Sequence, residues 1–424
     1  MSCVRLIVKN VEQLVQVCCN KEQFKSGQQQ DDVALLERRP DGVGCCIAVD
    51  NDGYIVDVGY DDQILPKYSS DTIVDGKNCS LIPGLVDSHT HPVFGGDRCF
   101  EFDMKMKGAT YLDIHKQGGG IYYTVRETAK APFSDLLANF EQRLQNMRDC
   151  GTTLVECKTG YGLDYETELK MLRVIDCIRK NNKNVDLVVN FLGAHAIPEG
   201  MNAEQGVESV IKNMKLIKEQ VPDLKVDFVD VFCETGVYDV NQSTRILLEG
   251  KKIFNAGINF HGDELTALGA GEMAKKIGAK AVSHLEYLDS NGIKAMASAN
   301  IVAIMCPTTA YLLKLKNPPV RQMITSGVPV AVATDFNPNA YCYSLPMAMN
   351  LAVVNFGMTL NEALVATTIN AAFALNKSNS FGSLEKGKVG DMILLNTNHW
   401  KHIIYEFGDI RKLIKCVIKR GSIF

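Results

Sequence analysis

The chain has 424 residues, 46% of them hydrophobic, and a formal net charge of −4 at pH 7. This length suits one large domain with a smaller one, and the acidic balance excludes the broad basic surface of nucleic-acid-binding proteins. No apolar run reaches the roughly 18 residues of a membrane helix, and the N-terminus has no secretory signal pattern. Because the 14 cysteines are scattered without a CxxC spacing, we expect a reduced, soluble, cytoplasmic protein that binds no membrane.

The two ends of the chain share a β-rich pattern. Residues 45–59, "CCIAVDNDGYIVDVG", place an Asn-Asp-Gly turn between two apolar runs, which indicates a hairpin. Short β-branched runs return after residue 384, as in "KLIKCVIKRGSIF". We therefore expect residues 1–82 and 384–424 to form one small β-sandwich domain. The polar segment 20–33, "NKEQFKSGQQQDDV", is predicted to be a mobile loop.

Residues 83–383 alternate strand-like and helix-like segments. Residues 134–149 and 166–181 have apolar side chains at helical spacing. Nearly continuous apolar strands joined by helices are typical of a parallel sheet that is buried on both faces. Eight such strands predict an α/β fold with a (β/α)8 TIM-type barrel. The predicted strands lie within residues 80–91, 151–160, 185–195, 226–236, 257–264, 280–288, 300–308 and 328–338.

Polar residues gather where these strands end, which is where barrel enzymes place their active sites. Five of the eight histidines fall at strand ends. Each alone is more often a structural residue, and Lys158 with Glu234 could be a buried ion pair, but the shared position favours an active site. In strand order the residues are His89 and His91, Lys158 and Tyr161, His195, Cys233 and Glu234, His261 and Glu264, His284, and Asp335 and Asn337.

His89 and His91 are separated by one residue. Side chains two positions apart in a strand point to the same face, so the two imidazoles would project together. An isolated His-x-His is more often a pair of ordinary histidines in a polar turn. With further histidines at neighbouring strand ends, the pair indicates a transition-metal site, for which zinc and iron are both suitable.

Several longer motifs resemble the amidohydrolase superfamily and, more closely, the imidazolonepropionase family within it. They include "HTHPVFGGDR", "GATYLDIHKQGGGIYYTV", "TTLVECKTGYGLDYETELKMLRVI", "NFHGDEL" and "ATDFNPNAYC". The likeness covers nearly the whole chain. Asn339 and Ala340 stand where bacterial members have a glycine and a small hydroxyl residue, as in animal-type members. At these two positions the resemblance therefore supports a contact through the backbone.

The resemblance implies a role for each matched position. One zinc or iron ion per subunit would be bound by His89, His91, His261 and Asp335. Proton transfer and catalysis would depend on Glu264, His284 and Asp335. Substrate or product would contact Arg98, Tyr111, Tyr161, His195, Glu264, Asn337 and Asn339. The fourth predicted strand ends without the lysine that bridges two metals in dinuclear relatives, which favours a single metal.

The activity implied by the resemblance is hydrolysis of a cyclic amide. The substrate would be 4-imidazolone-5-propanoate and the product N-formimidoyl-L-glutamate, in the degradation of histidine to glutamate. Arg98 suits the propanoate, because a guanidinium binds a carboxylate in a bidentate manner. The family further implies a homodimer. Two alternatives are another cyclic amidohydrolase or deaminase of the superfamily, and a catalytically silent binding protein.

Overall fold

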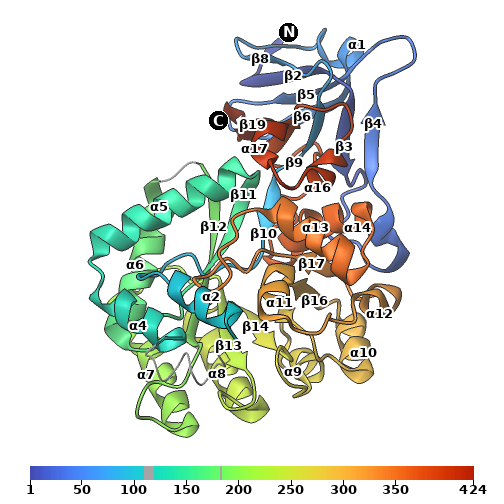
Figure 1. Cartoon of the computed structure of the whole chain (residues 1–424). Helices are drawn as coiled ribbons and strands as arrows, with labels where there is room; N and C mark the ends of the chain where they lie inside the picture. Colours follow the sequence, from blue (N-terminus) through green and yellow to red (C-terminus); the bar gives the residue numbers. More distant parts are fainter. Residues whose placement is uncertain (109–118, 182–183) are drawn as a thin grey trace.

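A computed structural model describes residues 1–108, 119–181 and 184–424. Figure 1 shows a large barrel and, beside it, a β-rich part that contains both chain ends. Among the helices of these described residues, none is both long enough and apolar enough to cross a bilayer.

The barrel contains eight parallel strands, which pair with one another in chain order. The first and last strands meet through an isolated parallel bridge between Thr90 and Phe336, which closes the ring. The predicted (β/α)8 architecture is therefore confirmed. The strands are β10 (Leu85–Asp87), β11 (Thr152–Lys158), β12 (Asp186–Ala194), β13 (Phe228–Cys233), β14 (Gly257–Gly262), β15 (Ala281–His284), β16 (Val302–Met305) and β17 (Val330–Val332).

Helices surround this barrel, and their apolar faces pack on the strands. The helices expected over 134–149 and 166–181 are α5 (Phe133–Asp149) and α6 (Tyr165–Asn181). The other barrel helices are α2 (Cys99–Met106), α4 (Ile121–Lys130), α7 (Ala203–Gln220), α8 (Val240–Phe254), α9 (Ala270–Ile277), α10 (Ser290–Ala299), α11 (Pro307–Leu313), α12 (Val320–Thr325), α13 (Leu345–Phe356), α14 (Leu360–Ala366) and α15 (Ile369–Ala374).

The two chain ends form two packed sheets with a shared core. Leu6, Leu14, Leu81 and Leu394 are fully buried in that core. One sheet has the order β20-β19-β18-β9-β3-β4 and the other β6-β5-β2-β8. The strands are β2 (Leu6–Val11), β3 (Gln13–Val17), β4 (Ala34–Glu37), β5 (Cys45–Val49), β6 (Ile55–Tyr60), β8 (Ile73–Asp75), β9 (Ser80–Pro83), β18 (Met392–Leu395), β19 (Ile414–Lys419) and β20 (Ser422–Ile423). The division of the chain at residues 82 and 384 stays a prediction.

Small elements complete this part of the chain. The strand β1 (Ser2–Cys3) pairs with β7 (Tyr68–Ser69), and the short helices are α1 (Asp61–Ile64), α16 (His402–Tyr405) and α17 (Ile410–Leu413).

The single strand predicted over 80–91 is split between the two parts of the molecule. Its first half, β9, pairs with β18 and β3 in the terminal sheet, whereas β10 pairs with β11 in the barrel. Gly84 lies at the junction, where a Cβ atom would lie 2.3 Å from Thr153 Oγ1. A glycine is therefore required for the chain to pass from one sheet into the other.

The prediction of a mobile loop over 20–33 is wrong. Residues Gly27–Asp31 form a short 3-10 helix, and Gln30 is fully buried. The Gln30 side-chain amide donates to the Val330 carbonyl and accepts from the Val330 amide, each at 3.2 Å. The Gln30 side chain therefore makes the two hydrogen bonds with the last barrel strand that the backbone of a neighbouring strand would make. The segment is packed on the barrel although its composition is polar.

Candidate active site

A cavity of about 660 Å³ opens at the carboxyl ends of the barrel strands. It is lined by ten of the residues that the sequence analysis singled out: His91, Arg98, Tyr161, His195, His261, Glu264, His284, Asp335, Asn337 and Asn339. His89 is fully buried beneath the cavity floor. Tyr111, which was also predicted to contact the substrate, lies outside the described residues.

Four of these side chains converge on one point at the cavity floor. His91 Nε2 lies 3.3 Å from His89 Nε2 and 3.4 Å from His261 Nε2. Asp335 Oδ1 lies 3.4 Å from the Nε2 atoms of both His89 and His91. Tetrahedral ligand atoms at bond lengths of about 2.0–2.1 Å lie about 3.3–3.4 Å apart, so the spacing fits one metal ion.

The neutral state of His89 and His91 and the hydrogen bonding of Asp335 agree with metal binding. Burial lowers the pKa of His89 and of His91 well below 6.5, so both imidazoles are neutral at physiological pH. Asp335 Oδ1 is buried and has no hydrogen-bond partner among the described residues. Such an acceptor is costly to bury unless something binds it. Neutral imidazoles and a free carboxylate oxygen are the forms that metals bind.

A shell of hydrogen bonds orients the imidazoles. His89 Nδ1 lies 2.7 Å from Ser283 Oγ, and His261 Nδ1 lies 3.0 Å from Asp230 Oδ1. Bonds of this kind hold the other ring nitrogen in its metal-binding direction. Burial acts to raise the pKa of Asp230, but His261 and Lys158 outweigh it and keep that pKa lowered. Asp230 is therefore a carboxylate that supports His261.

Lys158 does not pair with Glu234, so the suggested ion pair between them is wrong. Its Nζ donates to Glu156 and to Asp230 at 2.7 Å each, and all three groups are almost fully buried. The Glu234 carboxylate instead accepts backbone N–H groups of the loop after β14, including that of Leu265 at 2.8 Å. The interior of the barrel is thus charged beneath the four converging side chains, and Lys158 belongs to that support.

Glu264 and His284 face each other on neighbouring strand ends. Glu264 Oε2 lies 3.7 Å from His284 Nε2. Burial raises the pKa of Glu264 well above 4.5, and the nearby carboxylates of Glu286, Asp335 and Glu234 act in the same direction. Burial lowers the pKa of His284, so this imidazole is neutral. A carboxyl group that readily takes up a proton, beside a neutral imidazole, is suited to proton transfer.

The backbone at these strand ends adopts unusual conformations. His284 and Asp335 have φ angles of +76° and +47°, and Asp263 has +51°. Residues other than glycine rarely adopt such backbone angles, and each residue held in this conformation costs of order 1–3 kcal/mol. The Asp263 carboxylate accepts the amides of Leu268 and Gly269, at 2.7 and 3.1 Å, which fixes the loop that carries Glu264.

A cationic pair lies at the outer part of the cavity. Arg98 donates to the buried carboxylate of Glu101 at 2.6 Å, yet its buried Nε has no partner among the described residues. Lys105 Nζ donates to Asn339 Oδ1 and also lines the cavity. Sequence reasoning missed Lys105 and Glu101. Both lie on α2, and their spacing of four residues places them on one face of that helix, directly after the N-cap residue Arg98. Two cations with one carboxylate leave a positive charge for an anionic ligand.

His195 and Tyr161 form an aromatic wall. The His195 ring stacks on His91 with centroids 4.9 Å apart, and it lies 5.4 Å from the Tyr161 ring. His195 Nδ1 lies 3.2 Å from the Gly160 carbonyl, and burial lowers the pKa of His195 to about 3. The ring is therefore neutral, with Nδ1–H donating to the backbone and Nε2 available as an acceptor.

The Asn337 side chain shapes its own turn. Its Nδ2 donates to the Asp335 carbonyl, and its Oδ1 accepts the amides of Asn339 and Ala340 at 2.7 and 2.9 Å. This side chain positions the cavity wall beside Asp335. Its amide is already engaged with the backbone, which the sequence pattern did not indicate.

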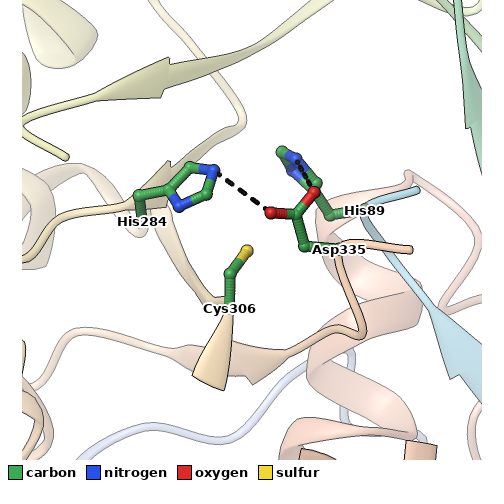
Figure 2. Close-up of side chains that lie close together, drawn as sticks. All are labelled: His89, His284, Cys306 and Asp335. Atoms are coloured by element: carbon green, nitrogen blue, oxygen red, sulfur yellow. Dashed lines mark ion pairs between the residues drawn. The ribbon is translucent and has the colours of Figure 1, made fainter. Parts of the chain in front are cut away.

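Cys306 was not predicted as a site residue. Figure 2 shows its thiol between His284 and Asp335, at the end of β16. It belongs to a buried group with His89, His284 and Asp335, in which one ligand atom of each lies within 4.8 Å of the others. A single cysteine after an apolar run carries no distinctive signal, so only the fold reveals this neighbourhood.

Comparison with known proteins supports this architecture. A model of the amidohydrolase family matches residues 80–423. Proteins named probable imidazolonepropionase are 48% identical in Mus musculus, over 99% of this chain and 98% of that protein, and 44% identical in Dictyostelium discoideum, over 99% and 97%.

Solved structures share the fold at low identity. A zinc-bound adenosine deaminase from Xanthomonas campestris has a TM-score of 0.74 at 16% identity, covering 100% of this chain and 93% of its own. A guanine deaminase from C. acetobutylicum has a TM-score of 0.69 at 16% identity, with 99% of both chains covered. The chain therefore belongs to the amidohydrolase family and, within it, to the family of the proteins named probable imidazolonepropionase.

Proposed function

We propose that the protein hydrolyses the cyclic amide of 4-imidazolone-5-propanoate to N-formimidoyl-L-glutamate, a step in the degradation of histidine. The observation that carries the proposal is one cavity with a metal-binding quartet at its floor and the cations Arg98 and Lys105 at its outer part. This separation suits a substrate with a reactive ring at one end and a carboxylate at the other. Relatives at 44–48% identity are named probable imidazolonepropionase.

His89, His91, His261 and Asp335 would hold one zinc or iron ion per subunit. The fit rests on atom spacings of 3.3–3.4 Å and on Asp335 Oδ1, which accepts no hydrogen bond from the residues that the structure describes. When bound, such an ion acts as a Lewis acid that activates water and polarises a carbonyl.

Glu264 and His284 would handle the protons. Glu264 accepts the proton of the attacking water as the new C–O bond forms at the ring carbonyl. It then returns that proton to the ring nitrogen as the C–N bond breaks, so no net proton is consumed by the carboxyl group. His284, being neutral, donates a hydrogen bond from one ring nitrogen to the carbonyl oxygen as negative charge develops there. Asp335, as a carboxylate, is the other group able to accept the water proton.

Arg98 and Lys105 would bind the propanoate group. Glu101 holds the Arg98 side chain at 2.6 Å, and within the described part of the chain Arg98 Nε–H has no partner and could donate to the ligand. Lys105, fixed by Asn339, would supply the second charged donor. His195 and Tyr161 would pack on the ring, with His195 Nε2 accepting a ring N–H.

A comparison of substrates tests the proposal. The purified protein is assayed with imidazolonepropanoate, guanine, cytosine and hydantoins. We expect turnover only of imidazolonepropanoate, because the uncharged rings leave Arg98 and Lys105 without an anion. Turnover of guanine or cytosine in its place would establish the alternative, a deaminase. Absence of turnover with any of these, in protein that contains the metal, would favour a binding protein or a different cyclic amide.

We further propose a cytoplasmic homodimer. None of the 14 cysteines is in a disulfide, which suits a reducing compartment. Apolar side chains on α2, among them Phe100, Phe102 and Met106, are 42–50% exposed. Sedimentation of the purified protein tests the oligomeric state, and a monomer at micromolar concentration would contradict the dimer.

A further inference from the structure

We propose that the cavity floor contains a second ion position, selective for soft divalent ions such as cadmium or excess zinc, formed by Cys306 Sγ, His284 Nε2 and Asp335 Oδ2. It depends on the proposed first metal site only in sharing Asp335. It does not depend on which cyclic amide the protein cleaves.

The geometry separates the two positions by the two oxygens of Asp335. Oδ1 faces the Nε2 atoms of His89 and His91 at 3.4 Å. Oδ2 lies on the other side, 3.9 Å from His284 Nε2. Figure 2 shows the Cys306 thiol directed to the space between His284 and Asp335. Together with His89, these groups place one ligand atom each within 4.8 Å of one another.

The three donor groups are buried, and one of them, Asp335 Oδ2, already accepts a hydrogen bond. His284 is 2% exposed, and its Nδ1 has no hydrogen-bond partner among the described residues. Its Nε2 lies 3.7 Å from a Glu264 oxygen and 3.9 Å from an Asp335 oxygen, and both distances are too long for a hydrogen bond. Cys306 is 1% exposed. Asp335 Oδ2 accepts from Thr309 at 2.5 Å, and a carboxylate oxygen can accept that bond and still bind an ion.

The donor set determines which ions would bind. Thiolate is a soft ligand that selects zinc and softer ions over magnesium or calcium, and imidazole and carboxylate complete a zinc-type set. Cys306 would bind as thiolate, with its proton released to solvent on coordination. The thiolate then supplies one new negative charge beside that of Asp335, which the two ions would share.

Occupancy of this position would fix His284. The Nε2 atom that faces Glu264 and Asp335 would be directed at the ion, so it could no longer exchange protons or hydrogen-bond a substrate. The second position is therefore inhibitory, and Cys306 makes the protein sensitive to thiophilic metals.

A cadmium titration of the metal-loaded protein tests the inference. Protein with one equivalent of zinc is titrated with Cd²⁺ in the presence of glutathione, which competes for ions at exposed thiols. After glutathione and its cadmium complexes are removed by gel filtration, bound zinc and cadmium are counted by elemental analysis. Thiolate-to-cadmium absorption of the protein is recorded in the ultraviolet. Wild type is compared with Cys306→Ser. The matched control is Cys233→Ser, which changes a fully buried cysteine at the end of β13, outside the group.

We expect wild type and Cys233→Ser to bind one cadmium ion more than Cys306→Ser, while all three keep one zinc ion. The absorption of one cadmium thiolate should be absent from Cys306→Ser. The affinity of Cys306→Ser for cadmium at this position should be at least about 100-fold lower than that of wild type. This loss exceeds the one produced by removing an outer-shell contact. Should Cys306→Ser fail to fold by circular dichroism, Cys306→Ala and His284→Asn give the same comparison without adding a hydroxyl.

Three outcomes would overturn the inference: equal cadmium counts in wild type and Cys306→Ser, identical absorption, or cadmium replacing zinc with the total unchanged at one ion. Turnover of imidazolonepropanoate is measured separately, without cadmium. Failure of that assay would contradict the proposed function and leave the cadmium result unaffected.

Discussion

Glu264 combines a buried position with several neighbouring carboxylates, and its pKa is raised well above 4.5. General acid–base groups contribute about 10²–10⁴-fold to a rate. Glu264→Gln should therefore lower kcat by about that factor while the protein keeps its metal. Because Glu264 would act as a base in its ionised form, wild-type activity should fall as the pH drops through this raised pKa, well above 4.5. The residual activity of Glu264→Gln should not show this fall at low pH. Steady-state kinetics across pH with metal analysis checks both points, and an unchanged kcat would refute the role.

Arg98 and Lys105 are expected to share the substrate carboxylate. A hydrogen bond to a charged group contributes about 1.5–3 kcal/mol, so Arg98→Met and Lys105→Met should each weaken binding about 10- to 150-fold. Arg98→Lys should recover part of the loss, because charge returns without the bidentate geometry. The readout is affinity for imidazolonepropanoate and for its amidated analogue, compared as a double-mutant cycle. If amidation costs wild type and Arg98→Met equally, Arg98 does not contact the carboxylate.

Asp230 would support the proposed metal site through His261, from which it lies 3.0 Å away. Asp230→Asn should lower the affinity for metal about 10- to 100-fold, the usual effect of losing an outer-shell carboxylate. Glu156→Gln is the matched control, because Glu156 pairs with the same Lys158 at 2.7 Å but does not contact His261. Competition with a chelator measures both affinities. Equal losses in the two variants would mean that the Lys158 ion pair matters and the contact with His261 does not.

Which residues line the site could be predicted from the sequence more readily than which residues contact one another there. His89, His91, His261, His284 and Asp335 could be found because periodicity places strand ends at one edge of a barrel. Glu101 and Lys105 were missed because they lie on a short helix after the first strand, away from the strand ends where barrel enzymes place their active sites. Cys306 was missed because its neighbours come from strands distant in sequence.

At the scale of elements, α9 and α10 follow the strands that carry His261 and His284. Gly271 on α9 approaches Gly292 on α10 so closely that a Cβ atom would lie 2.5 Å from the Gly292 Cα. Alanine favours a helix over glycine by about 1 kcal/mol, but overpacking costs about 1–3 kcal/mol or more. Gly271→Ala should therefore lower the free energy of unfolding.

Urea denaturation measures this effect. Gly408→Ala is the control, because a Cβ atom there meets nothing within 4 Å. A Gly271→Ala protein as stable as Gly408→Ala would show that the two helices can separate at little cost.

The elements that sequence reasoning placed correctly were those with a strong period. The helices α5 and α6 have amphipathic repeats, and the barrel strands are continuous apolar runs. Residues 20–33 were misjudged because a glutamine side chain, Gln30, takes the place of a backbone partner for Val330. Composition does not distinguish such a segment from a solvated loop. The break at Gly84 was missed because both of its flanks are apolar.

At the scale of the whole molecule, the metal should contribute to stability. An ion that binds only the native state stabilises it by about 4 kcal/mol when its free concentration is 1,000 times Kd. Chelation should therefore lower the thermal midpoint of wild type. His261→Ala should fold, contain no metal and show no response to the chelator.

His399→Ala, which changes an exposed histidine far from the site in sequence, should respond as wild type does. Calorimetry with and without chelator measures the three midpoints. Full activity in thoroughly chelated wild type would contradict a role for the metal.

The barrel closes at a seam between the segments that follow its first strand and its last strand. The Asp335 amide donates to the His89 carbonyl, and the His91 amide donates to the Phe336 carbonyl, at 3.1 and 2.8 Å. The proposed ligands therefore span this seam, with His89 and His91 on one side and Asp335 on the other. A nascent chain on the ribosome exposes His89 and His91 long before Asp335 is synthesised. With these ligands, complete coordination would have to wait for the last barrel strand. Metal acquisition would then follow translation of the barrel and would not guide its early folding.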